Sequence, residues 1–139
     1  MTEPASNVAV IRALYDAFGA GDVAGALGQM DPEIVWNEAE NFPYADGNPY
    51  VGPQAVLDGV FARCGSEWDG FAVEIGSLLD AGDHVVATGR YRGAWPSTGR
   101  AMNPQIVHIW TLANGKAVRF QQHVDTLDVA LARGAVAWV

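Results

Sequence analysis

The chain has 139 residues, half of them hydrophobic and 17% charged, with a formal net charge of −8. This size and composition are typical of one globular domain, which we expect to span residues 1–139. The eight basic residues are scattered, so nucleic acids and anionic membrane surfaces, which attract clustered Lys and Arg, are not expected as partners.

The cysteine content, the N-terminal residues and the apolar runs of the sequence indicate a cytoplasmic location. Cys64 is the sole cysteine, so no disulfide forms within the chain, as is usual in a reducing compartment. The first residues lack the basic and apolar regions of a signal peptide. Apolar runs stay well short of the ~18 residues that a membrane-spanning helix needs. We therefore expect a cytoplasmic protein without a membrane partner.

The first half of the chain has mainly helical periodicity. Apolar residues at helical spacing predict a helix over 8–18, with Ser6 or Asn7 as its N-cap. Asp22 is expected to cap a second, shorter helix. The remaining predictions are a short strand at 33–38, a long loop at 39–52 and a third helix from Pro53 to Gly65.

From Gly70 onward the period changes to two, which indicates strands. We expect strands near residues 71–79, 84–95, 100–112 and 116–124, followed by a short helix capped by Asp125 or Thr126. Helices followed by an antiparallel meander predict an α+β fold, with helices packed on one face of a curved sheet.

Several short motifs resemble the nuclear transport factor 2-like superfamily, in its SnoaL-like, ketosteroid-isomerase-related branch. They are Ala20-Gly21-Asp22, Gly52-Pro53-Gln54-Ala55-Val56 and the stretch from Gly115-Lys116 to Asp125-Thr126. The resemblance implies a cone-shaped, strongly curved antiparallel sheet, with three N-terminal helices on its concave face around a hydrophobic pocket. It also implies a homodimer. The same scaffold serves isomerases, polyketide cyclases, epoxide hydrolases, dehydratases and binding proteins, so it indicates fold more than activity.

The catalytic positions of that family are matched here by other residue types. Counting without gaps, the tyrosine, the base aspartate and the protonated aspartic acid of steroid isomerases fall on Leu14, Asn37 and Val107. The aspartate of limonene-epoxide-hydrolase-like members falls on Gln122. We therefore expect neither activity.

The final hairpin predicts which side chains face the pocket. Asn114-Gly115 favours a two-residue turn that pairs Ala113 with Lys116. Regular pairing from that turn places one set on the pocket floor: Gln105, Val107, Ile109, Phe120 and Gln122. The other set, Ile106, His108, Trp110 and His123, then lies on the outer face, where we expect the homodimer interface. A shift of one residue exchanges the two sets.

Glu38 is the candidate catalytic base, because it lies beside the family's base position at the end of a strand. The alternative is a solvated carboxylate. Further candidate ligand-binding residues are Trp36, Asn37, Tyr44, Tyr50 and Phe61. Asn37 and Gln122 are expected either to orient a ligand oxygen or to satisfy loop backbone. The three histidines lack metal-binding spacing, so no metal is expected, and nothing demands a cofactor.

Two functions remain open at this point. The first is a domain that binds a small hydrophobic molecule and acts as an isomerase, cyclase or lyase on a carbonyl compound. The alternative is a non-catalytic ligand-binding or assembly module of the same fold. The absent family residues favour the alternative, whereas a carboxylate retained in the pocket favours the enzyme.

Overall fold

The computed structural model describes residues 5–139, and its helices lie mainly in the first half of the chain. The helices are α1 (Asn7–Gly19), α2 (Val23–Leu27), a 3-10 turn (Pro43–Gly47), α3 (Pro53–Val56), a π-helical turn (Leu57–Phe61), α4 (Ala62–Glu67) and α5 (Thr126–Arg133). Since α3, the π-helical turn and α4 are continuous, they form one helix over 53–67, two residues longer than expected. None of the described helices is long and apolar enough to cross a membrane.

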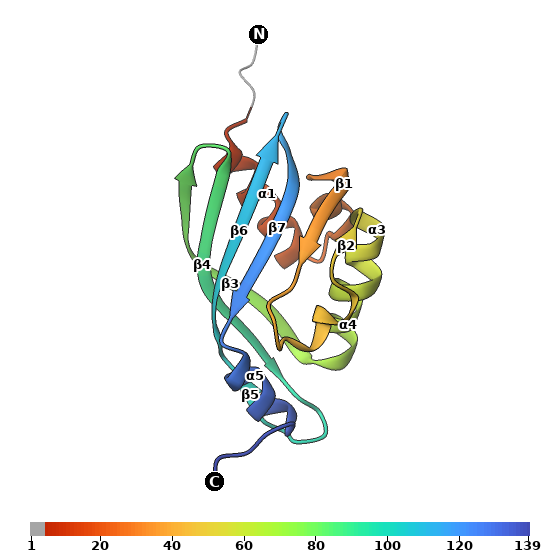
Figure 1. The fold of residues 1–139 in the computed structure, drawn as a ribbon, viewed down its shortest axis with the longest axis vertical. Helices are drawn as coiled ribbons and strands as arrows, with labels where there is room; N and C mark the ends of the chain where they lie inside the picture. Colours follow the sequence, from red (N-terminus) through yellow and green to blue (C-terminus); the bar gives the residue numbers. More distant parts are fainter. Residues whose placement is uncertain (1–4) are drawn as a thin grey trace.

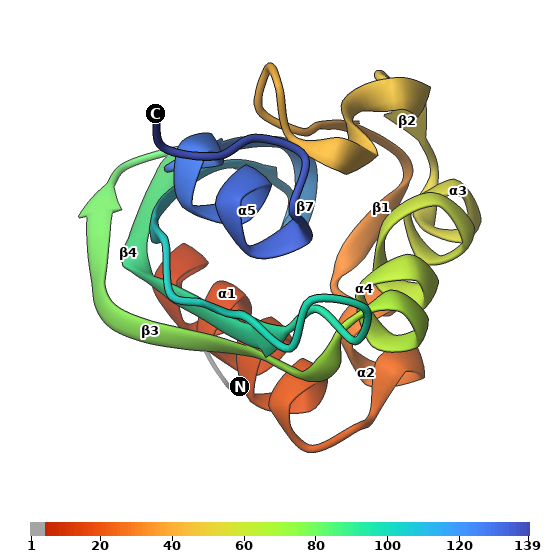
Figure 2. The same cartoon turned by 90° about the horizontal axis from the view of Figure 1, so that it is seen from below.

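The strands form one strongly curved sheet that does not close into a barrel (Figures 1 and 2). They are β1 (Met30–Asn37), β2 (Tyr50–Val51), β3 (Asp69–Ala81), β4 (His84–Ala94), β5 (Ala101–Met102), β6 (Gln105–Ala113) and β7 (Lys116–Val124). The order across the sheet is β2-β1-β7-β6-β4-β3, and β5 pairs with β4. The predicted α+β cone is confirmed; its pairs are antiparallel apart from β1 and β7, which run parallel.

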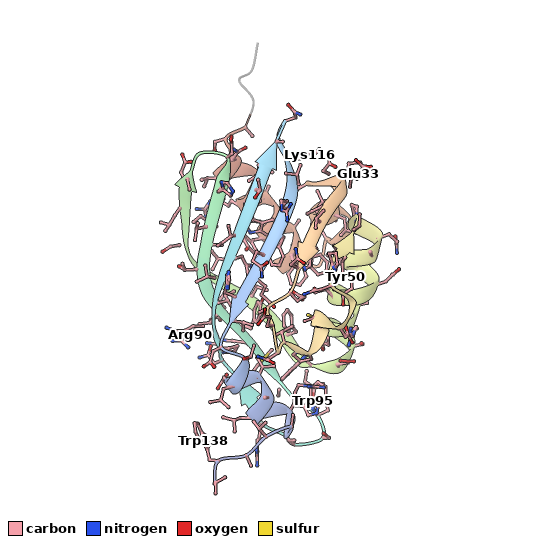
Figure 3. All side chains as sticks on the ribbon, in the orientation of Figure 1. Glu33, Tyr50, Arg90, Trp95, Lys116 and Trp138 are labelled. Atoms are coloured by element: carbon pink, nitrogen blue, oxygen red, sulfur yellow. The ribbon has the colours of Figure 1, made fainter. Side chains whose placement is uncertain are left out.

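Helices cover the concave side and one end of this sheet. Figure 2 shows α1 inside the curve of β3 and β4 and the helix over 53–67 beside β1, and Figure 1 shows α5 at the lower end of the sheet. The N-caps hold these positions: the side chains of Ser6, Asp22 and Asp125 accept backbone hydrogen bonds from the first turns of α1, α2 and α5. The C-terminal Trp138 projects away from the rest of the molecule (Figure 3).

The final hairpin contains the expected turn and an unexpected bulge. Asn114 and Gly115 have φ of 52° and 74°, as a two-residue type I′ turn requires, and Ala113 pairs with Lys116. Leu112 then pairs with Ala117, but Thr111 pairs with Arg119. Val118 is therefore an extra residue in β7, and beyond it every cross-strand partner shifts by one position.

This bulge reverses the predicted faces of β6. Phe120 and Gln122 do lie inside, but Phe120 is opposite Trp110 and Gln122 is opposite His108. The prediction that Gln105, Val107 and Ile109 line the pocket is wrong, because Gln105 is exposed and the other two are half-buried on the outer face. The prediction that Ile106, His108 and Trp110 lie on the outer face with the exposed His123 is also wrong, because these three are buried in the core. A homodimer remains a prediction, without that interface.

The face assignment is testable with two isoleucines of the same strand. Ile106 is 2% exposed in the core, whereas Ile109 is half-buried on the outer face. We expect Ile106→Ala to lower the free energy of unfolding by about 3 kcal/mol, because it leaves a cavity in packed surroundings. Ile109→Ala should cost less than half as much. Urea unfolding of both variants measures the difference, and equal or reversed losses would contradict the assignment.

Candidate functional site

A small cavity lies between the concave face of the sheet, α1 and the helix over 53–67. Its volume is about 40 Å³, room for a few water-sized atoms. Its walls are mainly apolar and aromatic. They comprise Leu14, Tyr15, Phe18, Trp36, Phe42, Val60, Phe61, Cys64, Phe71, Val73, Trp110 and Phe120, with Glu38, Tyr91, His108 and Gln122 as further polar members. A few convergent polar groups in an apolar cavity are typical of a ligand site.

Glu38 is the acidic residue of this cavity and is 3% exposed. β1 ends at Asn37, so Trp36 and Glu38 both reach the cavity while Asn37 does not line it. One carboxylate oxygen, Oε2, accepts a hydrogen bond from Trp36 Nε1 at 3.3 Å. The other, Oε1, is buried without a hydrogen-bond partner among the described residues. An unsatisfied buried acceptor is costly, which marks this oxygen as available to a ligand.

Two amide side chains hold the backbone around Glu38. Asn48 accepts a hydrogen bond from the Glu38 backbone N–H and donates one to its carbonyl, both at 2.9 Å. Gln122 accepts from the backbone N–H of Ala39 at 3.0 Å. The chain leaving β1 is therefore fixed on both sides, and the carboxylate keeps its direction.

Burial changes the protonation of Glu38. Desolvation raises its pKa to about 8, and the Trp36 hydrogen bond and the charge of Arg63 offset only part of that effect. At neutral pH the group is mainly protonated, and it ionises just above. A carboxyl group poised in this range serves as a general base or acid near physiological pH.

A hydrogen-bond network joins three further polar groups of the cavity. His108 contacts the Tyr15 hydroxyl through Nδ1 at 2.5 Å and the Tyr91 hydroxyl through Nε2 at 2.6 Å. Trp110 Nε1 donates to the Tyr15 oxygen at 2.9 Å, and Gln122 Nε2 donates to the Tyr91 oxygen at 2.8 Å. The network therefore ties α1 to β4, β6 and β7 through buried polar contacts.

The imidazole in this network is neutral. Burial lowers the pKa of His108 to about 3, with a smaller contribution from His123. Burial also raises the pKa of both tyrosine hydroxyls above the usual range, so they remain protonated. Within residues 5–139 no group of three or more His, Cys, Asp or Glu side chains is arranged to hold a metal ion.

Five of the candidate residues from the sequence line the cavity, and two further candidates, both tyrosines, are buried elsewhere. Trp36, Glu38, Phe61, Phe120 and Gln122 all line the cavity. Tyr44 and Tyr50 are buried but do not line it, because their hydroxyls hold the 39–52 loop.

The contacts of these two tyrosines are specific. Tyr44 donates a hydrogen bond to Glu67 at 2.8 Å, and Tyr50 donates one to the Tyr44 carbonyl at 2.6 Å. Their role in the structure is to anchor the loop against the helix over 53–67.

Sequence reasoning missed Tyr15, Tyr91 and His108 as cavity residues. Tyr15 and His108 lie one position after Leu14 and Val107, where gapless counting placed the family's polar groups. Glu38 follows Asn37 in the same way. The helical stripe of α1 contained Tyr15 as an available signal, whereas the position of His108 depended on the bulge at Val118.

Three aromatic rings lie between the cavity and a hollow on the surface. Phe18, Phe61 and Phe71 line both the cavity and a surface hollow of about 330 Å³ between α1, α4 and the start of β3. The ring centroids of Phe18 and Phe61 are 4.9 Å apart, and those of Phe18 and Phe71 are 6.4 Å apart. Because the hollow and the cavity share these rings, rotation of the rings would connect the two spaces.

Comparison with known proteins places this site in a known scaffold. The family model of the SnoaL-like domain matches residues 11–120. A nuclear transport factor 2-like protein from Burkholderia thailandensis is 35% identical, with a TM-score of 0.88 over 92% of this chain and 97% of that one. TerC, co-crystallised with polyporic acid, is 25% identical, with a TM-score of 0.81 over 92% of this chain and 98% of its own.

A more distant similarity extends to a protein with a ketosteroid isomerase-like fold from Catenulispora acidiphila, in complex with trimethylamine. It is 16% identical, with a TM-score of 0.75 over 90% of this chain and 92% of that one, and this likeness shows the fold alone. No curated protein sequence matches the chain significantly.

The raised pKa of Glu38 predicts a pH dependence of stability. The folded-state pKa of about 8 lies above the ordinary value of 4.5, so the folded state binds more protons between these two values. The contribution of Glu38 to stability is thus fully present below about pH 4.5 and is lost as pH rises towards 8, by a few kcal/mol at most. Relative to wild type, Glu38→Gln should gain stability as pH rises from 5 to 8, measured by urea unfolding.

The matched control for this measurement is Glu33→Gln. Glu33 lies in β1, the strand that directly precedes Glu38, but it is exposed, at the end of the sheet near Lys116 (Figure 3). Its variant should follow wild type at every pH. Parallel stability curves for wild type and Glu38→Gln would show that Glu38 is not desolvated.

Proposed function

The chain belongs to the SnoaL-like domain family, and on that premise we propose that it binds a small, mainly apolar carbonyl compound and moves a proton on it, with Glu38 as the base. The observation that carries this proposal is the buried Oε1 of Glu38, an unpartnered oxygen in an apolar cavity. Isomerisation, cyclisation and elimination on carbonyl compounds begin with the same step, removal of a proton from carbon next to the carbonyl.

The cavity supplies what this step requires. The ionised carboxylate of Glu38 takes the proton, and negative charge develops on the ligand oxygen. A hydroxyl from Tyr15 or Tyr91 donates a hydrogen bond to that oxygen, in surroundings from which the aromatic walls exclude water. Charge stabilisation by donors already in place is most effective in such a dry site.

A relative supports the ligand class in general terms. TerC, at 25% identity over nearly its full length, was co-crystallised with polyporic acid. That complex supports a small organic molecule as the ligand of the present chain.

A second candidate is a binding module without turnover. The cavity has a volume of only about 40 Å³, so a molecule larger than a few atoms fits only if wall residues such as Phe18, Phe61 and Phe71 move. A site whose walls must move to admit a ligand favours slow release, which suits sequestration more than turnover. The two functions differ in whether bound ligand exchanges its protons.

Deuterium exchange tests the proposed proton transfer whatever product the reaction forms. Acetophenone, cyclohexanone and 2-cyclohexenone are incubated with the protein in D₂O, and loss of the proton signal next to the carbonyl is followed by NMR. We expect wild type to accelerate exchange and Glu38→Gln to lose at least 100-fold of that rate. Glu33→Gln is the control and should retain it.

The pH profile of this exchange provides an independent check. Since the active form of Glu38 is ionised and its pKa is about 8, the rate should rise about tenfold per pH unit below pH 7.5 and level off above about 8. Ketone binding without exchange in wild type would reject catalysis and support the binding module. Neither binding nor exchange would reject the carbonyl ligand.

A further inference from the structure

The network around His108 contains more protons than it uses. Two hydrogen bonds join the imidazole to the hydroxyls of Tyr15 and Tyr91. Three protons are available to those bonds: one on each hydroxyl and one on the neutral ring. Each bond uses one proton, so one is left over.

The tautomer of the ring determines where the spare proton lies. If Nδ1 carries the ring proton, it donates to Tyr15, and Tyr91 donates to Nε2; the proton of Tyr15 is then unused. If Nε2 carries it, the arrangement is reversed, and the proton of Tyr91 is unused. The spare proton is on a hydroxyl in both cases.

The outer partners of the network do not take this proton. Trp110 donates to the Tyr15 oxygen and Gln122 donates to the Tyr91 oxygen, and neither group accepts. The amide orientation of Gln122 is set by its oxygen, which accepts from the backbone N–H of Ala39. Within residues 5–139 neither hydroxyl has a further hydrogen-bond acceptor, and both tyrosines line the cavity.

We propose that His108 is a positioning residue whose tautomer decides whether Tyr15 or Tyr91 presents its hydroxyl proton to an oxygen of the ligand. The cavity therefore contains one movable donor with two alternative positions, and it selects a ligand that offers an acceptor oxygen. The part of this inference that concerns the ligand rests on the proposed function. The tautomer part rests on the geometry of the network alone.

The surroundings of His108 keep its ring neutral, as the proton count requires. The ring is 4% exposed, and its two nitrogens bond the hydroxyls of Tyr15 and Tyr91 rather than any carboxylate of residues 5–139. Electrostatic repulsion by the neighbouring His123 lowers the pKa of His108 further. A neutral histidine between two hydroxyls has two tautomers that form equivalent hydrogen bonds. A single hydrogen bond from a ligand can therefore favour one tautomer over the other.

Two matched variants test the tautomer without any ligand. In Tyr15→Phe, Nδ1 loses its partner, so the ring should carry its proton on Nε2, where Tyr91 accepts it. In Tyr91→Phe the ring should carry its proton on Nδ1, where Tyr15 accepts it. An unpartnered N–H is costlier to bury than a hydroxyl that can rotate towards the cavity. Nitrogen NMR of ¹⁵N-histidine-labelled protein identifies the protonated nitrogen of His108 in each variant.

The expected result is opposite tautomers of His108 in the two variants. The same tautomer in both, or a doubly protonated ring in wild type at neutral pH, would overturn the proposal. If one variant fails to fold, Trp110→Phe replaces it: the Tyr15 oxygen then lacks its outer donor, so the proton should shift towards Nδ1. No shift in that variant would also count against the proposal.

A ligand measurement tests the spare donor. Each single variant keeps one spare hydroxyl proton. Tyr15→Phe with Tyr91→Phe keeps none but leaves an unpartnered N–H on His108, so His108→Phe is combined with them to remove that donor as well. Acetophenone should bind this triple variant about tenfold more weakly than either single variant, the effect of one hydrogen bond. α-Methylstyrene, which has CH₂ in place of the carbonyl oxygen, should bind all three alike.

The two proposals fail in different ways. Equal acetophenone affinities across these variants would reject the spare donor even if deuterium exchange through Glu38 is observed. Absence of acetophenone binding to wild type would reject the carbonyl ligand. The His108 tautomers in the two tyrosine variants would then be the remaining test of the proposed network.

Discussion

The β-bulge at Val118 is the constraint on which the interior of this protein depends. Next to the turn, Ala117 pairs with Leu112. Because β7 then contains one extra residue, Phe120 and not Arg119 pairs with Trp110. Beyond the bulge, the inward-facing residues of both strands meet. His108 is thereby placed opposite Gln122 on the concave side, and both reach Tyr91 on the neighbouring strand β4. Without that offset these side chains would face opposite sides of the sheet.

The polar groups of the cavity differ in how far they are satisfied. His108, Gln122 and the two tyrosines hydrogen-bond one another, which fixes their geometry although one hydroxyl proton is left over. One oxygen of Glu38, in contrast, has no partner among the described residues. The site thus offers a ligand one acceptor, at Glu38, and one hydroxyl donor, at Tyr15 or Tyr91.

The position of Glu38 depends on contacts from distant parts of the chain. Gln122, 83 residues further along the chain than Ala39, holds the backbone directly after Glu38, while Asn48 holds Glu38 itself. Gln122 thus belongs both to the Tyr91 network and to the loop that positions the carboxylate. A change in one part of the site therefore reaches the other through a single amide.

The sequence by itself determined the α+β class, the helix cap at Asp22, the turn at Asn114-Gly115 and the likeness to SnoaL-like domains. It narrowed two further caps to Ser6 or Asn7 and to Asp125 or Thr126, of which the structure uses Ser6 and Asp125. These features depend on local chemistry: capping side chains, left-handed turn residues and apolar periodicity. It also singled out Glu38, because that residue lies beside the family's base position at the end of the predicted strand.

Only the tertiary structure decided which face of β6 lies inside. The bulge at Val118 has no local signature, and a shift of one residue moves every side chain of a strand to the other side of the sheet. His108 and Trp110, predicted on the outer face, therefore line the cavity, while Val107 and Ile109, predicted inside, lie on the outer face. The pairing of Tyr15 with His108 across 93 residues likewise exists only after α1 has packed into the curved sheet.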